Sequence, residues 1–478
     1  MTDPWATSAV AAHVAAGVDL HVELAGPGLR SGLTHALREA ARTGRLAPGT
    51  RLPSSRSLAA DLGVARNTVA DAYAELVAEG WLTARQGSGT SVAQRAAVPR
   101  RAAPAAAPRR RTPGKPAYSL LPGAPDLASF PRAEWLKAAR RALTEAPNEA
   151  FGLGDARGRP ELRTAIAGYL ARSRGVRADP ERIVVCSGFV HGLTLIAKVL
   201  RGRRVREMAV ESYGLDIHWD LLAEAGLRTV PLGFDALGSR TGELMGLRGA
   251  GAVLLTAAHQ FPMGVPLHPE RRSAAVDWAR TTGGLVLEDD YDGEFRYDRQ
   301  PVGALQDLDP ERVVYLGTAG KALAPGLRIG WMVLPEALVE PVTRAKGAFE
   351  WTVSSLDQLT LAEFVESGAY DRHVRGMRLR YRRRRDQLVA ALAERAPDVR
   401  VTGIAAGLHA VLELPPGTED SVVRAAAWQG LAVYGLGRHT HPSASAAARR
   451  RDALVVGYGT PPDSAWAGAL DALCRALP

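Results

Sequence analysis

Residues Gly284–Trp331 read GLVLEDDYDGEFRYDRQPVGALQDLDPERVVYLGTAGKALAPGLRIGW, and this stretch decides the fold. Three apolar runs begin in it: Leu285–Glu288, Val313–Leu316 and Leu327–Val333. Runs of this length and β-branched content are typical of buried strands in a parallel-type sheet. Polar and charged side chains follow the runs, so we expect a buried sheet with its chemistry at the strand ends.

Four kinds of side chain stand at these strand ends. Asp289 and Tyr291 leave the first strand. Lys321 lies in a glycine-flanked turn after the second, and Arg328 begins the third. A carboxylate keeps a pyridine nitrogen protonated, a phenol bonds a ring oxygen, a lysine forms a Schiff base and a guanidinium holds a phosphate. Lys321 alone would be read as a solvated loop lysine, but the ordered set predicts a site for pyridoxal 5′-phosphate.

Further groups suit the phosphate of this cofactor. Ser187 and Gly188 directly follow the apolar run Ile183–Cys186 and precede a predicted helix. Backbone N–H groups at a helix N-terminus bind phosphates, so we expect both residues at the phosphate. Thr318, three residues before Lys321, adds a hydroxyl group.

Four segments resemble the aminotransferase-like half of the MocR regulators, which belong to the GntR superfamily. They are Thr256–Gly264 (TAAHQFPMG), Glu288–Phe295 (EDDYDGEF), Tyr315–Trp331 (YLGTAGKALAPGLRIGW) and Ser354–Arg378 (SSLDQLTLAEFVESGAYDRHVRGMR). The resemblance covers nearly the whole chain. It implies a fold-type I aminotransferase architecture, which is α/β with a mostly parallel sheet and a smaller C-terminal subdomain.

The resemblance also assigns roles to single residues. It makes Lys321 the Schiff-base lysine and gives Asp289, Tyr291 and Arg328 the contacts described above. It implies that the cofactor ring is lined by His259 and Gln260. Arg438, within VYGLGRH, matches a position where the family often places an arginine that takes an effector carboxylate. A surface arginine is the alternative for Arg438.

Three positions depart from the family's pattern, all where the cofactor is expected. The family usually has Tyr where FGLGDARG places Leu153, and Ser before the lysine where Gly320 stands. It usually reads EDPGY where this chain reads ESYGL, which puts Leu215 at the ring-stacking position and Tyr213 two places early. Each change weakens one contact and none removes the lysine. We expect the cofactor to bind, with a weak or shifted pocket as the alternative.

The N-terminal part has the pattern of three short helices. Apolar residues recur at helical spacing in Leu29–Ala41. After a turn-rich connector, Ser54 or Ser55 caps a second helix that runs to Leu62. A glycine turn separates it from a third helix, which opens at Arg66. This layout predicts a helix-turn-helix.

Two short strands follow, Trp81–Arg85 and Thr90–Ala93, joined by a glycine-rich turn. The whole segment Leu52–Val92 closely resembles the GntR-type winged helix. Readers of the major groove present side chains from the start of the third helix, and an arginine near the wing suits phosphate or minor-groove contact. The candidates for DNA contact are Arg56, Arg66, Asn67, Thr68, Arg85, Gly87 and Gly89. A solvated surface charge is the alternative for each arginine.

The composition divides the chain into four parts. Residues 1–27 form an extension without clear periodicity, 28–93 the winged helix-turn-helix, 94–117 a linker and 118–478 the aminotransferase-like domain. Five prolines predict an extended, semi-rigid linker. Residues 93–117 carry seven basic groups and no acid, which is most of the net charge of +10. Such an arm suits nucleic acid, and a solvated tether is the alternative.

From Tyr118 onward, predicted helices alternate with apolar strands, which indicates an α/β domain with a mostly parallel sheet. The helices are Glu134–Leu143, Pro160–Ser173 and Gly192–Leu200, and the further strands are Ile183–Cys186, Glu207–Val210 and Ala252–Thr256. The resemblance adds a long helix that includes Asp371–Leu392. Arginines cover more than one face of it, so we expect them to be solvated: Arg375, Arg378, Arg380 and Arg382–Arg385.

No apolar run reaches the roughly 18 residues that a membrane helix needs, and the first residues lack a basic region followed by an apolar core. We expect a cytoplasmic protein. Cys186 and Cys474 are the only cysteines. Two thiols are too few for a disulfide framework or for a cysteine cluster that binds a metal ion. We therefore expect both cysteines to be structural and expect no metal site.

Three functions stay open. The first is a transcription regulator that binds DNA through residues 28–92 and senses pyridoxal 5′-phosphate, with or without an amine or amino acid, through residues 118–478. The resemblance implies a head-to-tail homodimer, which would also supply two half-sites for DNA. The second is a working aminotransferase that carries a DNA-binding domain, and the third a dimerisation scaffold without cofactor. The resemblance favours vitamin B6 homeostasis, with the cofactor alone as signal, because Leu215 and Ile217 are apolar where amine-sensing members of the family keep Tyr and Arg.

Overall fold

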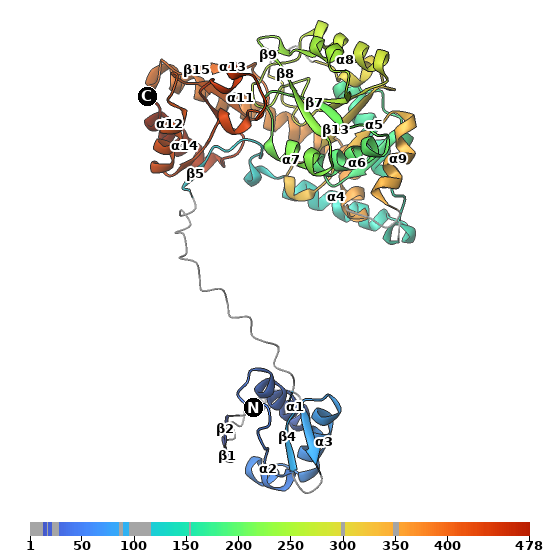
Figure 1. Ribbon diagram of the computed structural model, residues 1–478, viewed down its shortest axis with the longest axis vertical. Helices are drawn as coiled ribbons and strands as arrows, with labels where there is room; N and C mark the ends of the chain where they lie inside the picture. Colours follow the sequence, from blue (N-terminus) through green and yellow to red (C-terminus); the bar gives the residue numbers. More distant parts are fainter. Residues whose placement is uncertain are drawn as a thin grey trace, which may run out of the picture. The chain divides into compact units, whose positions relative to one another are not determined.

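The computed structural model describes residues 13–16, 18–21, 28–85, 89–94, 116–152, 154–297, 302–347 and 353–478. The chain divides into an N-terminal unit, Met1–Thr112, and a C-terminal unit, Pro113–Pro478 (Figure 1). Most of the predicted linker and N-terminal extension, together with Gly87 and Leu153, lies outside the described residues. The two units are described separately below.

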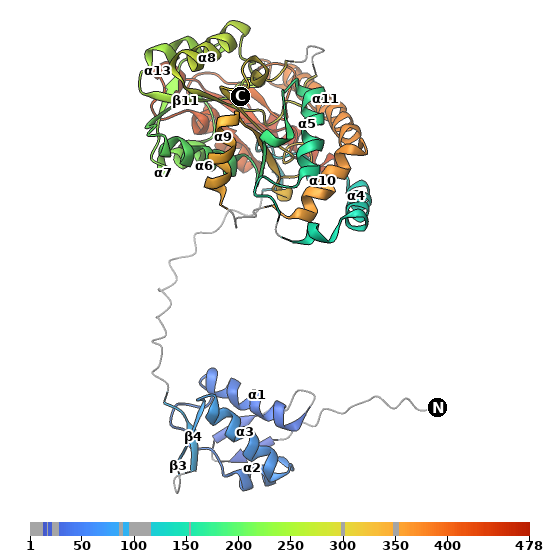
Figure 2. The ribbon, with the colours of Figure 1, turned by 90° about the vertical axis from the view of Figure 1, so that its right-hand side faces the viewer.

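The N-terminal unit packs three helices beside a two-stranded antiparallel sheet (Figure 2). The helices are α1 (Leu29–Arg42), α2 (Ser55–Leu62) and α3 (Arg66–Ala78), and the strands are β3 (Leu82–Arg85) and β4 (Gly89–Val92). This is the winged helix-turn-helix that the sequence predicted. A second antiparallel pair, which the sequence did not indicate, joins β1 (His13–Ala16) to β2 (Val18–His21).

Local signals in the sequence set these helix ends. The Ser54 side chain caps α2 by accepting a hydrogen bond from the Ser57 N–H at 3.1 Å. Gly63 ends α2 with φ of +66°, a conformation that favours glycine. The apolar stripes of α1 and α3 meet in one core, in which Leu33 and Leu76 are fully buried. The turn and the core together hold the start of α3 at the surface.

A seven-stranded sheet forms the centre of the C-terminal unit, in the order β6-β14-β13-β12-β11-β7-β8. The strands are β6 (Ile183–Cys186), β7 (Glu207–Glu211), β8 (Arg228–Leu232), β11 (Ala250–Leu255), β12 (Leu285–Asp289), β13 (Val313–Thr318) and β14 (Gly330–Val333). Strands β8, β7, β11, β12 and β13 run parallel to one another. The mostly parallel sheet was therefore predicted correctly.

The prediction for β14 was wrong in two respects. This strand pairs antiparallel with both β13 and β6, and it begins at Gly330, not at Leu327. Only residues 319–329 separate β13 from β14, which is too short for the crossover that a parallel neighbour requires. Arg328 consequently lies in the turn before the strand.

Helices cover both faces of the sheet, so the C-terminal unit has three layers. Successive side chains of β6 point to opposite faces of the sheet, since Val184 packs in one apolar core and Val185 in the other. One face carries α6 (Phe189–Gly202), α7 (Asp216–Glu224) and α9 (Glu336–Lys346). The other carries α5 (Pro160–Arg174), α10 (Ser355–Glu366) and α11 (Ala369–Arg395), with α4 (Arg132–Glu145) packed on α10 and α8 (Pro269–Thr282) in a further cluster. Both cysteines are buried free thiols, as predicted.

A smaller C-terminal subdomain follows α11, as the resemblance implied. Its antiparallel sheet has the order β15 (Arg400–Thr402), β16 (Ala410–Glu413), β19 (Ala453–Val456) and β18 (Tyr434–Gly435). Its helices are α12 (Glu419–Trp428), α13 (Ala446–Arg449) and α14 (Asp463–Ala476). Short strand pairs complete the unit: β5 (Tyr118–Ser119) with β17 (Leu431–Ala432), and β9 (Phe234–Asp235) with β10 (Gly238–Ser239).

The expectation that all α11 arginines are solvated was wrong. Arg384 is buried, and its guanidinium donates to Asp126 Oδ2 at 3.1 Å and to Asp463 Oδ1 at 2.6 Å. Arg378 donates to the Glu294 carbonyl oxygen. Arg375, Arg382 and Arg383 are exposed, as expected, whereas Arg384 lies on the packed side of the helix. Acidic partners distant in sequence neutralise its buried charge.

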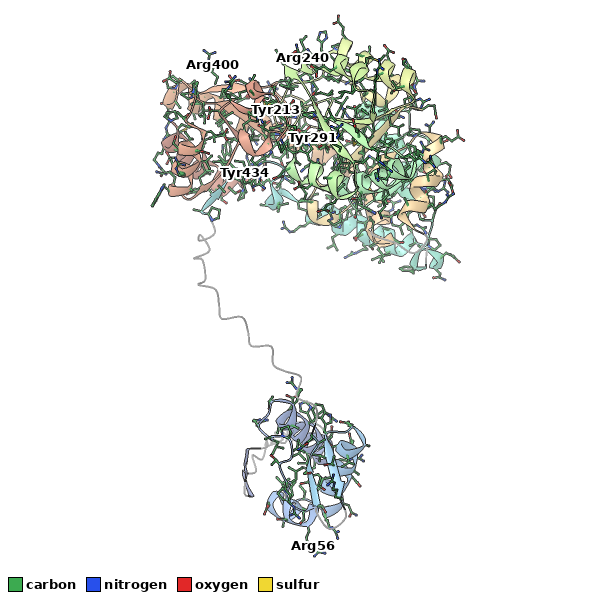
Figure 3. All side chains as sticks on the ribbon, viewed as in Figure 1. Arg56, Tyr213, Arg240, Tyr291, Arg400 and Tyr434 are labelled. Atoms are coloured by element: carbon green, nitrogen blue, oxygen red, sulfur yellow. The ribbon has the colours of Figure 1, made fainter. Side chains whose placement is uncertain are left out.

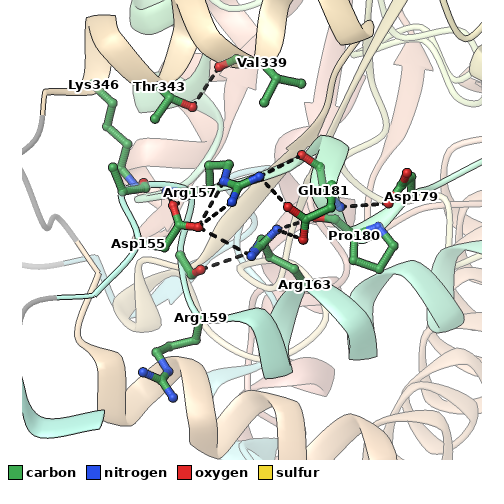
Figure 4. Close-up of polar contacts among 12 residues, drawn as sticks. Asp155, Arg157, Arg159, Arg163, Asp179, Pro180, Glu181, Val339, Thr343 and Lys346 are labelled. Carbon is green, nitrogen blue, oxygen red and sulfur yellow. Dashed lines mark hydrogen bonds and ion pairs between the residues drawn. The ribbon is translucent and has the colours of Figure 1, made fainter. Parts of the chain in front are cut away.

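A polar network fixes the loop before α5 against β6 (Figure 4). Arg157 donates to Asp155 Oδ2 at 2.7 Å and to Glu181 Oε2 at 2.6 Å. Arg163 is buried and donates to Glu181 Oε1 at 3.0 Å. Lys346 Nζ bonds the Val185 carbonyl oxygen at 2.8 Å. Because β6 leads directly to Gly188, the network anchors one wall of the site described below.

We expect Gly158→Ala to lower the free energy of unfolding by about 2–4 kcal/mol. Gly158 has φ of +102°, and a Cβ atom there would lie 2.6 Å from Val185 Cβ. Alanine at this position would therefore suffer both backbone strain and a steric clash with Val185. Urea unfolding followed by tryptophan fluorescence measures the loss. Gly154→Ala is the control, because a Cβ at Gly154 would have no neighbour within 4 Å among the described residues. Equal stability of the two variants would contradict the prediction.

Candidate functional site

A cavity of about 430 Å³ lies at the ends of β7, β12 and β13 in the C-terminal unit. Figure 3 marks Tyr291 in this region, beside the C-terminal subdomain. The loops after these parallel strands meet at one edge of the sheet, as in other open α/β sheets. The cavity is lined by six of the predicted cofactor residues: Gly188, Asp289, Tyr291, Thr318, Lys321 and Arg328.

Lys321 carries the amine of the site. Its Nζ donates to the Gly123 carbonyl oxygen, a contact between segments distant in sequence. Burial lowers the pKa of Lys321, while the Asp289 and Asp292 carboxylates oppose the shift. A lowered pKa increases the fraction of neutral amine, which is the form that attacks a carbonyl group.

Asp289 ends β12 and is buried against the cavity. Burial raises its pKa well above the ordinary value, and the nearby Lys321 ammonium works in the opposite direction. Among the described residues, no group donates a hydrogen bond to this carboxylate. A protonated pyridine nitrogen supplies both the missing donor and the missing charge, so this residue fits pyridoxal 5′-phosphate.

The phosphate side of the cavity combines a helix N-terminus with a guanidinium group. Gly188 is the N-cap of α6 and has φ of +89°. Arg328, in a left-handed turn with φ of +53°, donates to the Ser187 carbonyl oxygen at 2.6 Å. A Cβ atom at Gly188 would lie 3.8 Å from the Arg328 guanidinium nitrogens, so glycine keeps this space open. Thr318 adds a hydroxyl from the end of β13.

Ser187 itself does not line the cavity. Its N–H donates to His191 Nδ1 at 3.1 Å and its carbonyl oxygen accepts from Arg328. Ser187 therefore positions Arg328 while Gly188 faces the cavity. Gly320, at a position where relatives usually have Ser, lines the cavity without a side chain.

Tyr291 belongs to a buried hydrogen-bond network behind the cavity. Its hydroxyl donates to the His259 carbonyl oxygen at 3.1 Å and lies 3.2 Å from His259 Nδ1. His259 Nδ1 also lies 2.8 Å from Asp292 Oδ2. His259, Asp292 and His409 form a group that could hold a metal ion, because their ligand atoms lie within 4.8 Å of one another. The sequence had not indicated this group. The His259–Asp292 contact already pairs two of the three.

The structure places His259 and Gln260 behind the cavity wall. Neither is among the residues that line it. The Gln260 amide donates to the Tyr213 carbonyl oxygen at 2.9 Å and to Glu211 Oε2 at 3.3 Å. These two residues support Tyr291 and Glu211, which do face the cavity.

Arg438 also lies outside the cavity lining. Its guanidinium is 3.5 Å from Asp216 Oδ2 and its central carbon is 4.4 Å from the centroid of the Tyr434 ring. Half of its side chain is exposed, at 52%. In this arrangement Arg438 is bound to Asp216 and does not face a ligand in the cavity.

Sequence reasoning missed several cavity residues, among them Gly123, His218 and His409. Gly123 and His409 lie far from the central motif in sequence and reach the cavity only through the fold. Asp292 is different, because it stands within the quoted motif EDDYDGEF and could have been recognised there.

Glu294 adds a pH-dependent contribution to stability next to the site. Burial, and then repulsion from the Asp290 carboxylate, raises the pKa of Glu294 from 4.5 to about 7. The folded chain therefore holds a proton there that the unfolded chain releases from about pH 4.5 upward. The resulting stability is present at low pH and is lost as pH rises through 7.

We expect Glu294→Gln to unfold at a higher temperature than the parent at pH 8 and at the same temperature at pH 5. Glutamine stays neutral and still accepts from the Tyr169 and Tyr370 hydroxyls, which lie 3.4 Å from Glu294 Oε1. Thermal unfolding at both pH values measures the difference. Glu149→Gln, at an exposed position, should show no pH-dependent change; a similar change in both variants would overturn the assignment.

In the N-terminal unit, the DNA-contact candidates of the third helix gather at its start. Arg66 and Asn67 are exposed there and Thr68 is partly exposed. Arg56 is exposed near the start of α2 and points outward in Figure 3. Their placement suits entry of α3 into a major groove with phosphate contacts beside it.

The wing carries the remaining candidates. Arg85 and Gly89 are exposed at the ends of β3 and β4. Gly89 has φ of +80°, and a Cβ there would lie 3.2 Å from Arg51 Nε. Arg51, which the sequence analysis did not single out, therefore stands beside the wing as a further cation.

Comparison with known proteins gives the class of this chain. Residues 29–92 match the family described as bacterial regulatory proteins of the gntR family, and residues 123–444 match aminotransferase class I and II. The archaeal alanine:glyoxylate aminotransferase structure shares the fold, with a TM-score of 0.67 over 75% of this chain and 90% of that one at 24% identity. The class is a DNA-binding transcription regulator with an aminotransferase-like domain.

Two full-length relatives give the family. The pyridoxine biosynthesis regulator PdxR of Corynebacterium glutamicum is 33% identical over 90% of this chain and 91% of its own length. The probable rhizopine catabolism regulatory protein MocR of Rhizobium meliloti is 34% identical over 87% of this chain and 88% of its own length. The chain belongs to the MocR subfamily of the GntR regulators.

Pyridoxal 5′-phosphate is the cofactor of this family, and the residues at the cavity fit it. When bound, the cofactor supplies an aldehyde that reacts with primary amines and a ring that withdraws electrons. Lys321 would supply the amine that reacts with the aldehyde, Asp289 the carboxylate for the ring nitrogen, and Gly188 and Arg328 the phosphate contacts. None of the helices in the described parts of the chain is long and apolar enough to cross a bilayer.

Proposed function

We propose that this regulator senses pyridoxal 5′-phosphate itself, and that the signal needs no amino acid. The observation that carries the proposal is the charge of the cavity lining. Among the described residues that line it, Arg328 supplies the one guanidinium, and it lies at the phosphate side. An amino-acid effector would need a second cation for its carboxylate. Arg438, the candidate for that role, is paired with Asp216.

Sensing requires that the cofactor bind one arrangement of the regulator more tightly than another, because equal affinity shifts no equilibrium. The relative PdxR is named a regulator of pyridoxine biosynthesis, and we propose control of vitamin B6 supply for this chain as well. Such a regulator works in the cytoplasm, where the DNA is.

A DNA-binding titration tests the proposal. We would select a DNA ligand from a random pool and measure its affinity by fluorescence anisotropy with and without pyridoxal 5′-phosphate. The cofactor alone should change the apparent Kd, and an added panel of amino acids should change neither Kd nor the visible spectrum. A response that appears only with an amino acid would contradict the proposal.

A working aminotransferase is the second candidate function. The lowered pKa of Lys321 favours it, because a neutral amine is also what turnover requires. The arms of one assay separate the two candidates. Multi-turnover conversion of an amino donor and a 2-oxo acid would establish the enzyme, whereas a cofactor-dependent change in DNA affinity without turnover supports the regulator.

We propose that the regulator works as a head-to-tail homodimer. Large apolar side chains stay exposed on this unit, including Phe151 at 57% and Ile217 at 54%. Ile217 also lines the cavity, so a second copy that covers the opening would bury it. Sedimentation equilibrium tests the dimer, and Ile217→Glu should weaken it. A monomeric parent chain at micromolar concentration would overturn this part of the proposal.

We expect Arg66→Ala to weaken binding to the selected DNA by about 1–3 kcal/mol, which is roughly 5- to 150-fold. Arg66 opens α3 and is exposed, where it can reach a base edge or a phosphate. Fluorescence anisotropy at fixed salt measures the loss. Arg42→Ala is the control in the same unit, because Arg42 is paired with Glu39 at the end of α1. Equal losses in both variants would mean that only overall charge matters.

A further inference from the structure

Three aromatic side chains follow β7 on the loop and helix beside the cavity: Tyr213, His218 and Trp219. The Tyr213 ring packs edge-on against Phe234, with centroids 5.4 Å apart, and its hydroxyl donates to the Ala448 carbonyl oxygen at 3.2 Å. Tyr213 is thereby held in an apolar cluster. Tyr213 also lines the cavity, but this packing fixes its ring in the cluster, so the ring cannot turn to cover a ligand ring.

Trp219 is fixed as well. Its ring lies 4.8 Å from that of His441, and it belongs to the apolar core beneath α6 and α7. A Cβ atom at Gly214 would lie 3.2 Å from the Trp219 ring, so the loop packs closely upon it. Trp219 therefore lines the cavity as part of a fixed wall.

His218 differs from both. It lies in the first turn of α7, lines the cavity with Lys321, and has its ring centroid 4.7 Å from that of Phe189. Phe189 directly follows Gly188 at the phosphate side. Among the described residues, the imidazole nitrogens of His218 have no hydrogen-bond partner. A polar ring that faces a cavity without a partner is available to a ligand.

We propose that His218 is the aromatic side chain that packs on the pyridine ring of the cofactor, in place of the aromatic residue that this chain lacks at Leu215. The inference rests on the pyridoxal 5′-phosphate site described above. Leu215 forms the N-cap of α7, and one helical turn separates it from His218. A ring three residues further along the same turn faces the same cavity.

The protonation state of His218 suits this contact. Burial, and then repulsion from the Lys321 ammonium, lowers the pKa of His218 to about 4. The imidazole is therefore neutral at physiological pH. A neutral aromatic ring packs favourably on an electron-poor pyridinium, whereas an imidazolium would repel it.

Two variants of similar volume separate a ring contact from simple space filling. His218→Phe keeps an aromatic ring, and His218→Leu fills the space without one. We would titrate each apo-protein with pyridoxal 5′-phosphate and follow the visible absorbance band of the bound cofactor. His218→Leu should bind on the order of tenfold more weakly and shift the band, and His218→Phe should bind within about twofold of the parent.

Tyr213→Phe is the matched control, because it keeps the ring in its apolar cluster and removes only the hydroxyl. It should match the parent in affinity and spectrum. Thermal unfolding of each apo-variant shows whether the fold is intact. Parental affinity of His218→Leu, or equal weakening in Leu and Phe variants, would overturn the proposal. A parent chain that gives no band would overturn the cofactor site and this proposal together, whereas a His218 failure leaves the parent's band in place.

Discussion

Replacing Lys321 by alanine abolishes the visible absorbance band that pyridoxal 5′-phosphate gives with the parent chain. The expected effect is complete, because Lys321 is the one lysine among the described residues that line the cavity. Burial lowers the pKa of the Lys321 amine, which favours the neutral form that attacks an aldehyde. Spectrophotometric titration measures the loss, and reduction with borohydride followed by peptide mass mapping locates the modified residue.

Lys198→Ala provides the control for this prediction. Lys198 is exposed on α6 in the same unit, so its removal should leave the band unchanged. A band that persists in Lys321→Ala would show that another amine holds the cofactor. A band absent from the parent chain would favour the third possibility, a dimerisation scaffold whose pocket has lost the cofactor.

Replacing Arg174 by methionine lowers the free energy of unfolding by about 3–5 kcal/mol. Arg174 and Asp290 form an ion pair at 2.6 Å, and their side chains are 3% and 2% exposed. The Tyr315 hydroxyl also donates to Asp290 Oδ2 at 2.8 Å. Removal of the guanidinium leaves a buried carboxylate without its counter-charge, directly after Asp289 in the chain. Urea unfolding measures the loss.

Two further variants isolate the reason for that loss. The double variant Arg174→Met with Asp290→Leu removes both charges and should recover much of the stability, because two apolar side chains can replace a buried ion pair. Arg172→Met, on the exposed side of the same helix at 62% exposure, should change stability by less than about 1 kcal/mol. A loss of that small size in Arg174→Met would contradict the prediction.

Local patterns made much of the fold predictable. The apolar runs at Leu285 and Val313 start β12 and β13 at the predicted residues, since buried strands require unbroken β-branched sequence. In the N-terminal unit, Ser54 and Gly63 specify their helix ends through a cap and a left-handed turn. These signals depend on residues close in sequence, which is why they can be read without the fold.

The core of the candidate site was also accessible from sequence. Asp289, Lys321 and Arg328 lie at or between strand ends within one stretch, and chemistry limits which residue types can serve a pyridine nitrogen, an aldehyde and a phosphate. The direction of β14 was not accessible, because a strand's partners are set by pairing and not by its own composition. The turn between β13 and β14 holds Arg328 in a left-handed conformation, which the sequence did not predict.

Motifs of adjacent residues were sufficient to predict the family and the cofactor, and they name the residues that we expect to hold the cofactor. Only the tertiary structure decided which other side chains join them. Gly123 reaches Lys321 across the unit, and Arg384 is buried against Asp126. Tyr213 and His218 both line the cavity, but the Tyr213 ring is packed in an apolar cluster. Some of these contacts join residues that are distant in sequence, and others decide which of two nearby side chains is available to a ligand. Both depend on packing across the whole unit.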